Sequence, residues 1–149
     1  FLKAARDTKE TRNLKSLYTE GQRRKISCLL RRIENAIELE KNCAILFDIC
    51  QTKKISGKYI VDFAQNTLLK PEKSLVPFAV FAYEKGECQW AINILHENIK
   101  EHKDEISIYA LASLLYIQNN IDEATKVIAA CETASEEIKQ LADLIKAKQ

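Results

Sequence analysis

The chain contains no Met and has little of the two residues that most often make turns. Among its 149 residues there are 3 Gly and 2 Pro, whereas Ala, Leu, Ile, Glu and Lys are abundant. A sheet protein needs many tight turns and β-branched runs, so this composition argues against β architectures and predicts an all-α protein. Because the sequence starts at Phe1 and lacks Met, we expect it to be a fragment or a processed product of a longer protein.

Long hydrophobic runs are also missing. No stretch approaches the about 18 apolar residues that a membrane-spanning helix requires, and there is no signal-peptide core. With 46% hydrophobic and 30% charged residues, the composition is typical of a folded, soluble chain. We therefore expect no membrane span, and a single helical domain over residues 22–149 that follows a polar, basic N-terminal arm over residues 1–21.

Residue patterns that carry catalysis or metal binding are scarce. His96 and His102 lie six positions apart, whereas a pair of metal ligands on one helix needs a spacing of three or four. No Gly-rich phosphate loop, nucleophile elbow or pair of catalytic carboxylates is recognisable. The number of cysteines is odd, and each lies among apolar residues in a helical pattern: Cys28, Cys43, Cys50, Cys88 and Cys131. We therefore predict a protein that is not an enzyme and has no cofactor or metal, with reduced thiols in an intracellular, cytoplasmic setting.

The positive charge is concentrated near the N-terminus. Residues 1–32 carry ten Lys or Arg and three Asp or Glu, a net +7, and the other 117 carry thirteen and eighteen, a net −5, which gives the overall +2. A basic patch is predicted on one helix by the spacing of its cations: Arg23, Arg24, Lys25, Arg31 and Arg32. Such a patch can bind phosphates or an acidic protein, or it can be a solvated face paired with Glu34, Glu38 and Glu40. No aromatic residues alternate with the charges, as single-strand binding requires, so the solvated face is favoured.

Apolar residues at a spacing of three and four predict helices through most of the chain. We expect Gly21 to interrupt the arm, and Asn42 to cap a second helix within the helical pattern of residues 22–52. Further on, local signals predict where helices begin and end: Ser56 as an N-cap, Ser74 at a helix start with Pro77 in its first turn, Asp104 as an N-cap, and Thr133 with Glu136 as a capping box.

One stretch of the chain, from Phe78 to Cys131, matches itself at a single fixed offset. The matched pairs are Phe78 with Leu111, Ala79 with Ala112, Tyr83 with Tyr116, Gly86 with Asn119, Ala91 with Ala124, and Leu95 with Ile128. These are the positions at which a hairpin of two helices needs a small residue, a sharp turn or a large apolar side chain. Each pair is 33 residues apart. A repeat with a period of about 33 or 34 residues is typical of stacked helix hairpins.

The repeat resembles the tetratricopeptide repeat family. That family's signature has a small residue in the first helix, Gly at the turn, and Ala followed by a large apolar residue in the second helix. The matching residues are Ala79, Gly86, Ala91 and Leu95 in one unit, and Ala112, Asn119, Ala124 and Ile128 in the next. The usual Trp and Pro are missing from both units, and Asn98 stands where a small apolar residue is usual. An earlier unit over residues 43–69 fits only with two inserted residues near Ser56.

The resemblance implies an α-solenoid of about three helix-hairpin units in which the first helices line a groove. The positions that would face this groove are Val76, Val80, Tyr83, Tyr109, Ser113 and Tyr116. Alternatively, Tyr109 and Tyr116 cover the core beside the C-terminal helix. That helix is expected to cap the stack through Ile138, Leu141, Leu144 and Ile145. Trp90 aligns with the charged Glu123, so it either marks a partner contact or packs in the core.

The function that these patterns favour is a protein–protein interaction module. It would be an adaptor, a chaperone or a subunit of a larger assembly that holds a peptide or a helix of another protein in its groove. The alternative is a nucleic-acid-binding helical protein that uses the basic helix over residues 23–32. Self-association through the apolar segment over residues 43–47 is a third interpretation.

Overall fold

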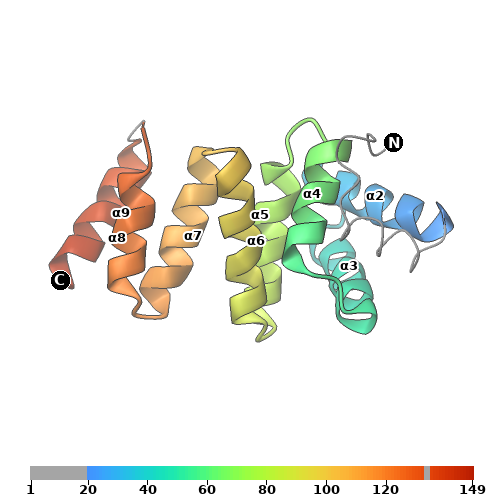
Figure 1. Cartoon of the computed structure of the whole chain (residues 1–149), viewed down its shortest axis with the longest axis horizontal. Coiled ribbons are helices and arrows are strands. Elements are labelled where there is room, and N and C mark those ends of the chain that lie inside the picture. Colours follow the sequence, from blue (N-terminus) through green and yellow to red (C-terminus); the bar gives the residue numbers. More distant parts are fainter. Residues whose placement is uncertain (1–19, 133–134) are drawn as a thin grey trace.

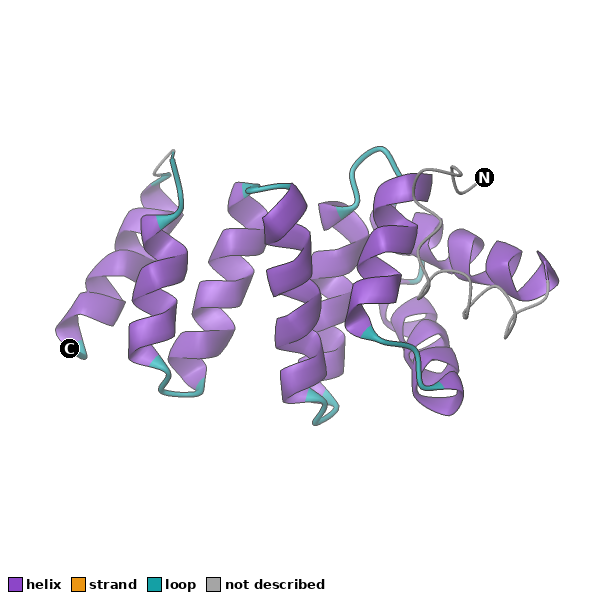
Figure 2. Cartoon of the chain, viewed as in Figure 1, coloured by secondary structure: helices purple, strands orange, loops and turns teal. Residues whose placement is uncertain are grey.

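The computed structural model of the protein describes residues 20–132 and 135–149, and these contain helices and turns but no strand. The predicted all-α fold is therefore confirmed for the described part of the chain (Figure 2). Its helices are α2 (Glu20–Glu34), α3 (Leu39–Lys53), α4 (Gly57–Thr67), α5 (Glu72–Glu84), α6 (Cys88–Glu101), α7 (Glu105–Ile117), α8 (Ile121–Ala129) and α9 (Glu136–Ala147). Of the predicted arm over residues 1–21, residues 1–19 lie outside the described ranges.

The helices α4 to α9 stand side by side along the long axis of the molecule, whereas α2 runs nearly along that axis (Figure 1). Helix α5 packs closely against α6, and α7 packs closely against α8; a short turn joins the two helices of each pair. Alternate helices also touch, because α3 contacts α5, α5 contacts α7, and α7 contacts α9. We call these four helices the α3–α5–α7–α9 layer. On the other side α4 packs on α6, and α2 lies against α3, α4 and α5.

The turns after α5 and α7 are built in the same way. Gly86 has φ +97° and Asn119 has φ +63°, both in the left-handed region that ends many helices. The N–H of Glu87 donates to the carbonyl of Ala82 at 3.1 Å, and at the matching place in the next unit the N–H of Asn120 donates to that of Leu115 at 2.9 Å. Hydrogen bonds from Gly86 to Tyr83 and from Asn119 to Tyr116 correspond in the same way.

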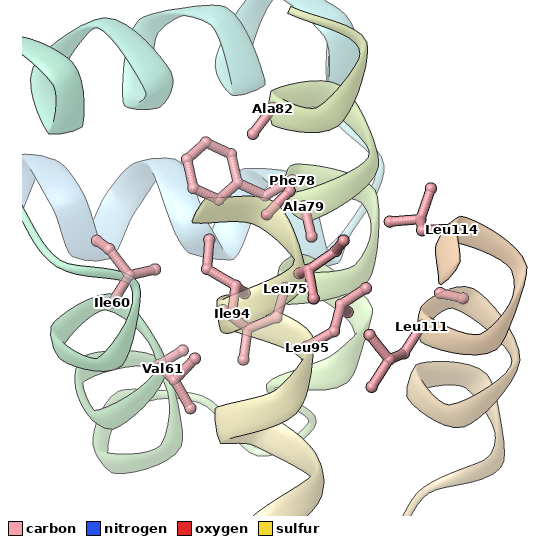
Figure 3. Close-up of a cluster of buried hydrophobic side chains, with 14 of the residues drawn as sticks. Ile60, Val61, Leu75, Phe78, Ala79, Ala82, Ile94, Leu95, Leu111 and Leu114 are labelled. Carbon is pink, nitrogen blue, oxygen red and sulfur yellow. The ribbon is translucent and has the colours of Figure 1, made fainter. Parts of the chain in front are cut away.

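Small residues are buried between the helices of both hairpins. Ala79, Ala91, Ala112 and Ala124 are each fully buried, as the offset repeat predicted. Around them larger side chains such as Leu75, Phe78, Leu95 and Leu111 fill the space between α5, α6 and α7 (Figure 3). This core continues without interruption from α2 to α9.

Several local predictions are confirmed at helix starts. The side chains of Ser56 and Asp104 accept hydrogen bonds from the N–H groups of Tyr59 and Ser107, at 3.2 and 2.7 Å. For α9 the N-cap is Ser135, which accepts from the N–H of Ile138 at 3.3 Å. Thr133, predicted to open a capping box, lies outside the described residues. α5 begins at Glu72, two residues before the predicted start at Ser74, so Pro77 lies within the helix rather than in its first turn.

Two predictions near the N-terminus are wrong. Gly21 does not interrupt the helix but lies in the first turn of α2, where a glycine costs little because the first N–H groups of a helix have no intrahelical partner. Asn42 is not an N-cap: it lies inside α3, buried, and its side-chain amide donates to the carbonyl of Ile37 at 2.7 Å. The break between α2 and α3 occurs instead at residues 35–38, where Ala36 and Glu38 have φ +56° and +39°.

Candidate functional site

The helix α7 is apolar on every side although one of its sides is open. Ten of its thirteen residues are apolar, the exceptions being Glu105, Ser107 and Ser113. A helix of this kind is normally surrounded by other apolar surface. α7 contacts α5, α6, α8 and α9, yet Ile106 and Ile117 keep 54% and 67% of their surfaces exposed. These two positions are eleven residues apart, so they lie on the same side of the helix.

A cavity of about 580 Å³ opens beside this side of α7. Its walls come from α5, α7 and α9: Val76, Val80, Glu105, Ile106, Tyr109, Ala110, Ser113, Leu114, Ser135, Glu137 and Ile138 line it. The structure thus brings together four of the six residues predicted to face a groove, which are Val76, Val80, Tyr109 and Ser113. The volume of this cavity lies within the roughly 300–1,000 Å³ that is usual for ligand clefts.

A hydrogen bond joins two of the helices that form this cavity. The carboxylate of Glu105, the first residue of α7, accepts from the N–H of Ser135 at 2.9 Å, and Ser135 is the N-cap of α9. The start of α7 is therefore fixed to the start of α9 on the rim of the cavity. This contact spans 30 residues of sequence, and no local pattern predicts it.

A second cavity, of about 540 Å³, continues the first along the same layer. It lies between α3 and α5, and it shares Val76 and Val80 with the first cavity. Its other lining residues are Leu39, Glu40, Cys43, Pro77, Phe81, Glu84 and Lys85. We refer to the two cavities together as the groove.

The two remaining predicted groove residues, Tyr83 and Tyr116, line neither cavity. Both are half-buried near the ends of α5 and α7. Burial raises the pKa of the Tyr83 phenol above its ordinary value, while a hydrogen bond with Gln118 acts in the opposite direction. The ammonium group of Lys148 lies 5.1 Å from the centre of the Tyr116 ring. The C-terminal end of the chain thus covers Tyr116, whereas Tyr109 stays 41% exposed on the cavity wall.

Trp90 lies in an aromatic cluster on the inner side of α6. Its ring meets those of Phe47 and Phe78 edge-on, with centres 6.1 and 5.7 Å away. The indole N–H donates to the carbonyl of Ile55 at 3.0 Å. These contacts hold α3, α5 and α6 together, which agrees with the core-packing interpretation of this residue.

The basic residues lie on α2, and none of them lines the groove. Arg24, Arg31 and Arg32 border a shallow cavity of about 500 Å³ together with Ser27, Cys28, Asn35 and Ile37. Lys25 is exposed on the same helix. Arg23 donates to the carboxylate of Glu20 at 2.7 Å, and this hydrogen bond lowers the pKa of Glu20. The same carboxylate also pairs with Arg24, whose Nε lies 3.6 Å from it. Arg23 and Arg24 are therefore both engaged by Glu20, and Arg24, Arg31 and Arg32 border one depression.

The thiols differ in their surroundings. All five are free; Cys28 is exposed, and Cys43 and Cys50 are buried. Burial raises the pKa of Cys43 to about 11 and that of Cys50 further, so both remain protonated at neutral pH. Within the described ranges, no three His, Cys, Asp or Glu side chains gather closely enough to hold a metal ion. None of the described helices has the length and apolar character needed to cross a membrane.

Comparison with known proteins leaves the site to be interpreted from its own chemistry. No protein-family model, no curated protein and no solved structure matches the chain.

Proposed function

We propose that this chain is a non-enzymatic protein-interaction module whose groove holds a peptide or helix of another protein. In this proposal α5/α6 and α7/α8 are units of a tetratricopeptide-like stack, and α9 covers its end. The corresponding hydrogen bonds in the turns after α5 and α7, together with the buried alanines, support a repeated hairpin. The protein would serve as an adaptor, a chaperone or a subunit of a larger assembly.

The observation that carries the proposal is the open apolar side of α7. Ile106, Tyr109 and Ile117 are exposed although their helix is central in the layer. Burial of this apolar surface by a partner would contribute about 25 cal/mol of binding free energy for each Å² covered. Exposed apolar patches of this kind mark interaction sites in soluble proteins. The adjoining cavity offers a place where an apolar side chain of the partner can be inserted.

A peptide-display selection tests this function. The intact chain is immobilised, and random peptides long enough to form several helical turns are selected for binding. Ser113→Arg places a long charged side chain in the cavity and should abolish binding of the selected peptides. Ala129→Arg, at an exposed position on α8, adds the same side chain outside the groove and should leave binding unchanged. The function is rejected if no peptide is selected, or if both variants bind the selected peptides as the unaltered chain does.

A second candidate function, nucleic-acid binding, is favoured by a single observation. Arg24, Arg31 and Arg32 converge on one depression of α2, and guanidinium groups pair well with phosphates. Neutralising several phosphates makes affinity fall steeply with salt, and the fall is large between about 50 and 200 mM. Titration of duplex and single-stranded oligonucleotides across that range decides this candidate. It is rejected if no binding occurs at the lower salt concentration.

A further inference from the structure

The charges at the edge of the groove are almost all negative. Of the described residues that line its two cavities, Glu40, Glu84, Glu105 and Glu137 are acidic and Lys85 is the only basic one. The ammonium of Lys85 lies 5.2 Å from the centre of the Phe81 ring and forms a cation–π contact with it. The walls between these carboxylates are apolar, with Val76 and Val80 common to both cavities.

The carboxylates lie at both ends of this apolar surface. Glu105 and Glu137 border the cavity between α5, α7 and α9, and Glu40 and Glu84 border the one between α3 and α5. Glu84 and Glu137 are exposed, and their carboxylates have no hydrogen bond or ion pair with any residue that the structure describes. They are therefore available to cations of a bound molecule, whereas Glu105 is engaged by Ser135.

From this arrangement we infer the chemistry of the occupant: a short amphipathic segment of another protein with an apolar centre and Lys or Arg on both sides. Its apolar side chains lie in the cavity between α5, α7 and α9 and over Val76 and Val80. Its cations face Glu137 at one end and Glu84 at the other. The apolar centre supplies most of the affinity, and the cations set orientation and speed of association. This inference rests on the proposed function of the groove.

Three synthetic peptides with the same Leu and Phe centre and with Lys, Gln or Glu flanks test the inference. Binding of each labelled peptide to the intact chain is measured by fluorescence anisotropy at low and high salt. Exposed ion pairs contribute modestly, so two of them should give the Lys-flanked peptide about 3- to 10-fold higher affinity than the Gln-flanked one. The Glu-flanked peptide should bind most weakly, and high salt should reduce the differences among the three.

Removal of the two carboxylates should abolish this preference. In Glu84→Gln/Glu137→Gln, the Lys- and Gln-flanked peptides should bind equally, with the affinity for the Gln-flanked peptide unchanged. The matched control Asp122→Asn/Glu123→Gln removes two charges from α8, outside the groove, and should keep the preference. Circular dichroism checks that both variants remain helical.

The outcomes separate this inference from the function on which it rests. If all three peptides bind equally and Ser113→Arg abolishes their binding, the groove binds peptides but the basic partner is refuted. If none binds and display selection also fails, the function itself is refuted. A fourth peptide carries residues 1–19 of this chain, which hold five Lys or Arg and two Asp or Glu. If it binds the groove more tightly than the Lys-flanked design, the occupant is the chain's own arm, and the inference of a foreign partner is overturned.

Discussion

The buried side chain of Asn98 should be a major determinant of stability, although it is polar. Asn98 is fully buried on α6. Its amide donates to the hydroxyl of Ser107 at 2.9 Å and to the carboxylate of Asp104 at 3.2 Å, and its carbonyl accepts from the amide of Gln65 at 3.2 Å. It thereby connects α4, α6 and the start of α7.

The substitution Asn98→Leu keeps a similar size and removes all three hydrogen bonds. A typical intramolecular hydrogen bond contributes about 0.5–1.5 kcal/mol net, and leaving a buried polar partner unsatisfied costs about 1–3 kcal/mol. The hydroxyl of Ser107 would lose the amide that donates to it. Because Ser107 is fully buried, water cannot take the place of that amide directly. We expect the free energy of unfolding to fall by about 2–4 kcal/mol.

Urea unfolding followed by circular dichroism measures this loss, with the slope m compared between variants to check that the same transition is observed. Asn93→Leu is the matched control, since Asn93 is exposed on the same helix and bonds only to Gln89 in the part of the chain described. It should change stability by less than about 0.5 kcal/mol. A loss below about 1 kcal/mol for Asn98→Leu would show that apolar packing, not this hydrogen-bond network, decides the position.

Three further predictions concern the turns, the thiols and the core. Gly86→Ala should lower the free energy of unfolding by about 1 kcal/mol, measured by urea unfolding, because φ is +97°. A steric clash is not the cause, since a Cβ there meets nothing within 4 Å, and an unchanged stability would argue that the turn adopts another conformation. With a disulfide reagent at pH 8, Cys28 should react first, and Cys43 and Cys50 should react only on unfolding. Burial raises the pKa of Cys43 to about 11, above the pKa of about 8.5 of an unfolded cysteine, so little of the reactive thiolate is present at pH 8. Rapid reaction of all five thiols in the folded chain would contradict the burial of the two. Leu111→Ala, at a fully buried position, should lower the melting temperature and cost about 2–5 kcal/mol, whereas Tyr109→Ala on the cavity wall should cost less than about 1 kcal/mol; equal losses would place Tyr109 in the core.

The sequence predicted many helix boundaries from Ser56 onward because their signals are local. Gly86 and Asn119 are among the few residue types that adopt a left-handed backbone readily, so each marks a helix end. Ser56 and Asp104 have side chains that accept from N–H groups at a helix start, and both do so. In each case the backbone conformation at a helix end favours a small set of residue types, so the residue itself marks the end.

The N-terminal half was harder to predict because its helix break uses residues that favour helices. Ala36 and Glu38 have positive φ values without being Gly, and such residues give no sign of a turn. The break is supported instead by a side-chain hydrogen bond across it, in which Asn42 donates to the carbonyl of Ile37. Tertiary packing also supports it, because α2 contacts three other helices. The earlier repeat unit expected over residues 43–69 could be matched only poorly, and this is the region where α2 contacts α3, α4 and α5.

The groove was predicted only in part, because its walls depend on how successive helices are placed. Val76, Val80, Tyr109 and Ser113 could be found by counting from the aligned turns, and all four line the first cavity. Ile138 and Glu137 also line it, but their approach to α5 and α7 depends on the orientation of α9, which no periodicity encodes. Tyr83 and Tyr116 were expected in the same groove because they share a face of the repeat, yet each lies at a helix end where neighbouring side chains cover it.

The residues of α7 that are buried in the core differ from those proposed to bind a peptide, and this separation makes the proposed experiments interpretable. Ile108, Leu111 and Leu115 are buried in the core, whereas Ile106, Tyr109 and Ile117 remain exposed. A substitution in the second set can therefore alter binding while the fold persists. The exception lies at the start of the helix. Ser107 is held by Asn98, while its neighbours Glu105 and Ile106 line the cavity. Asn98→Leu should therefore weaken peptide binding as well as stability, although Asn98 itself lines no part of the groove.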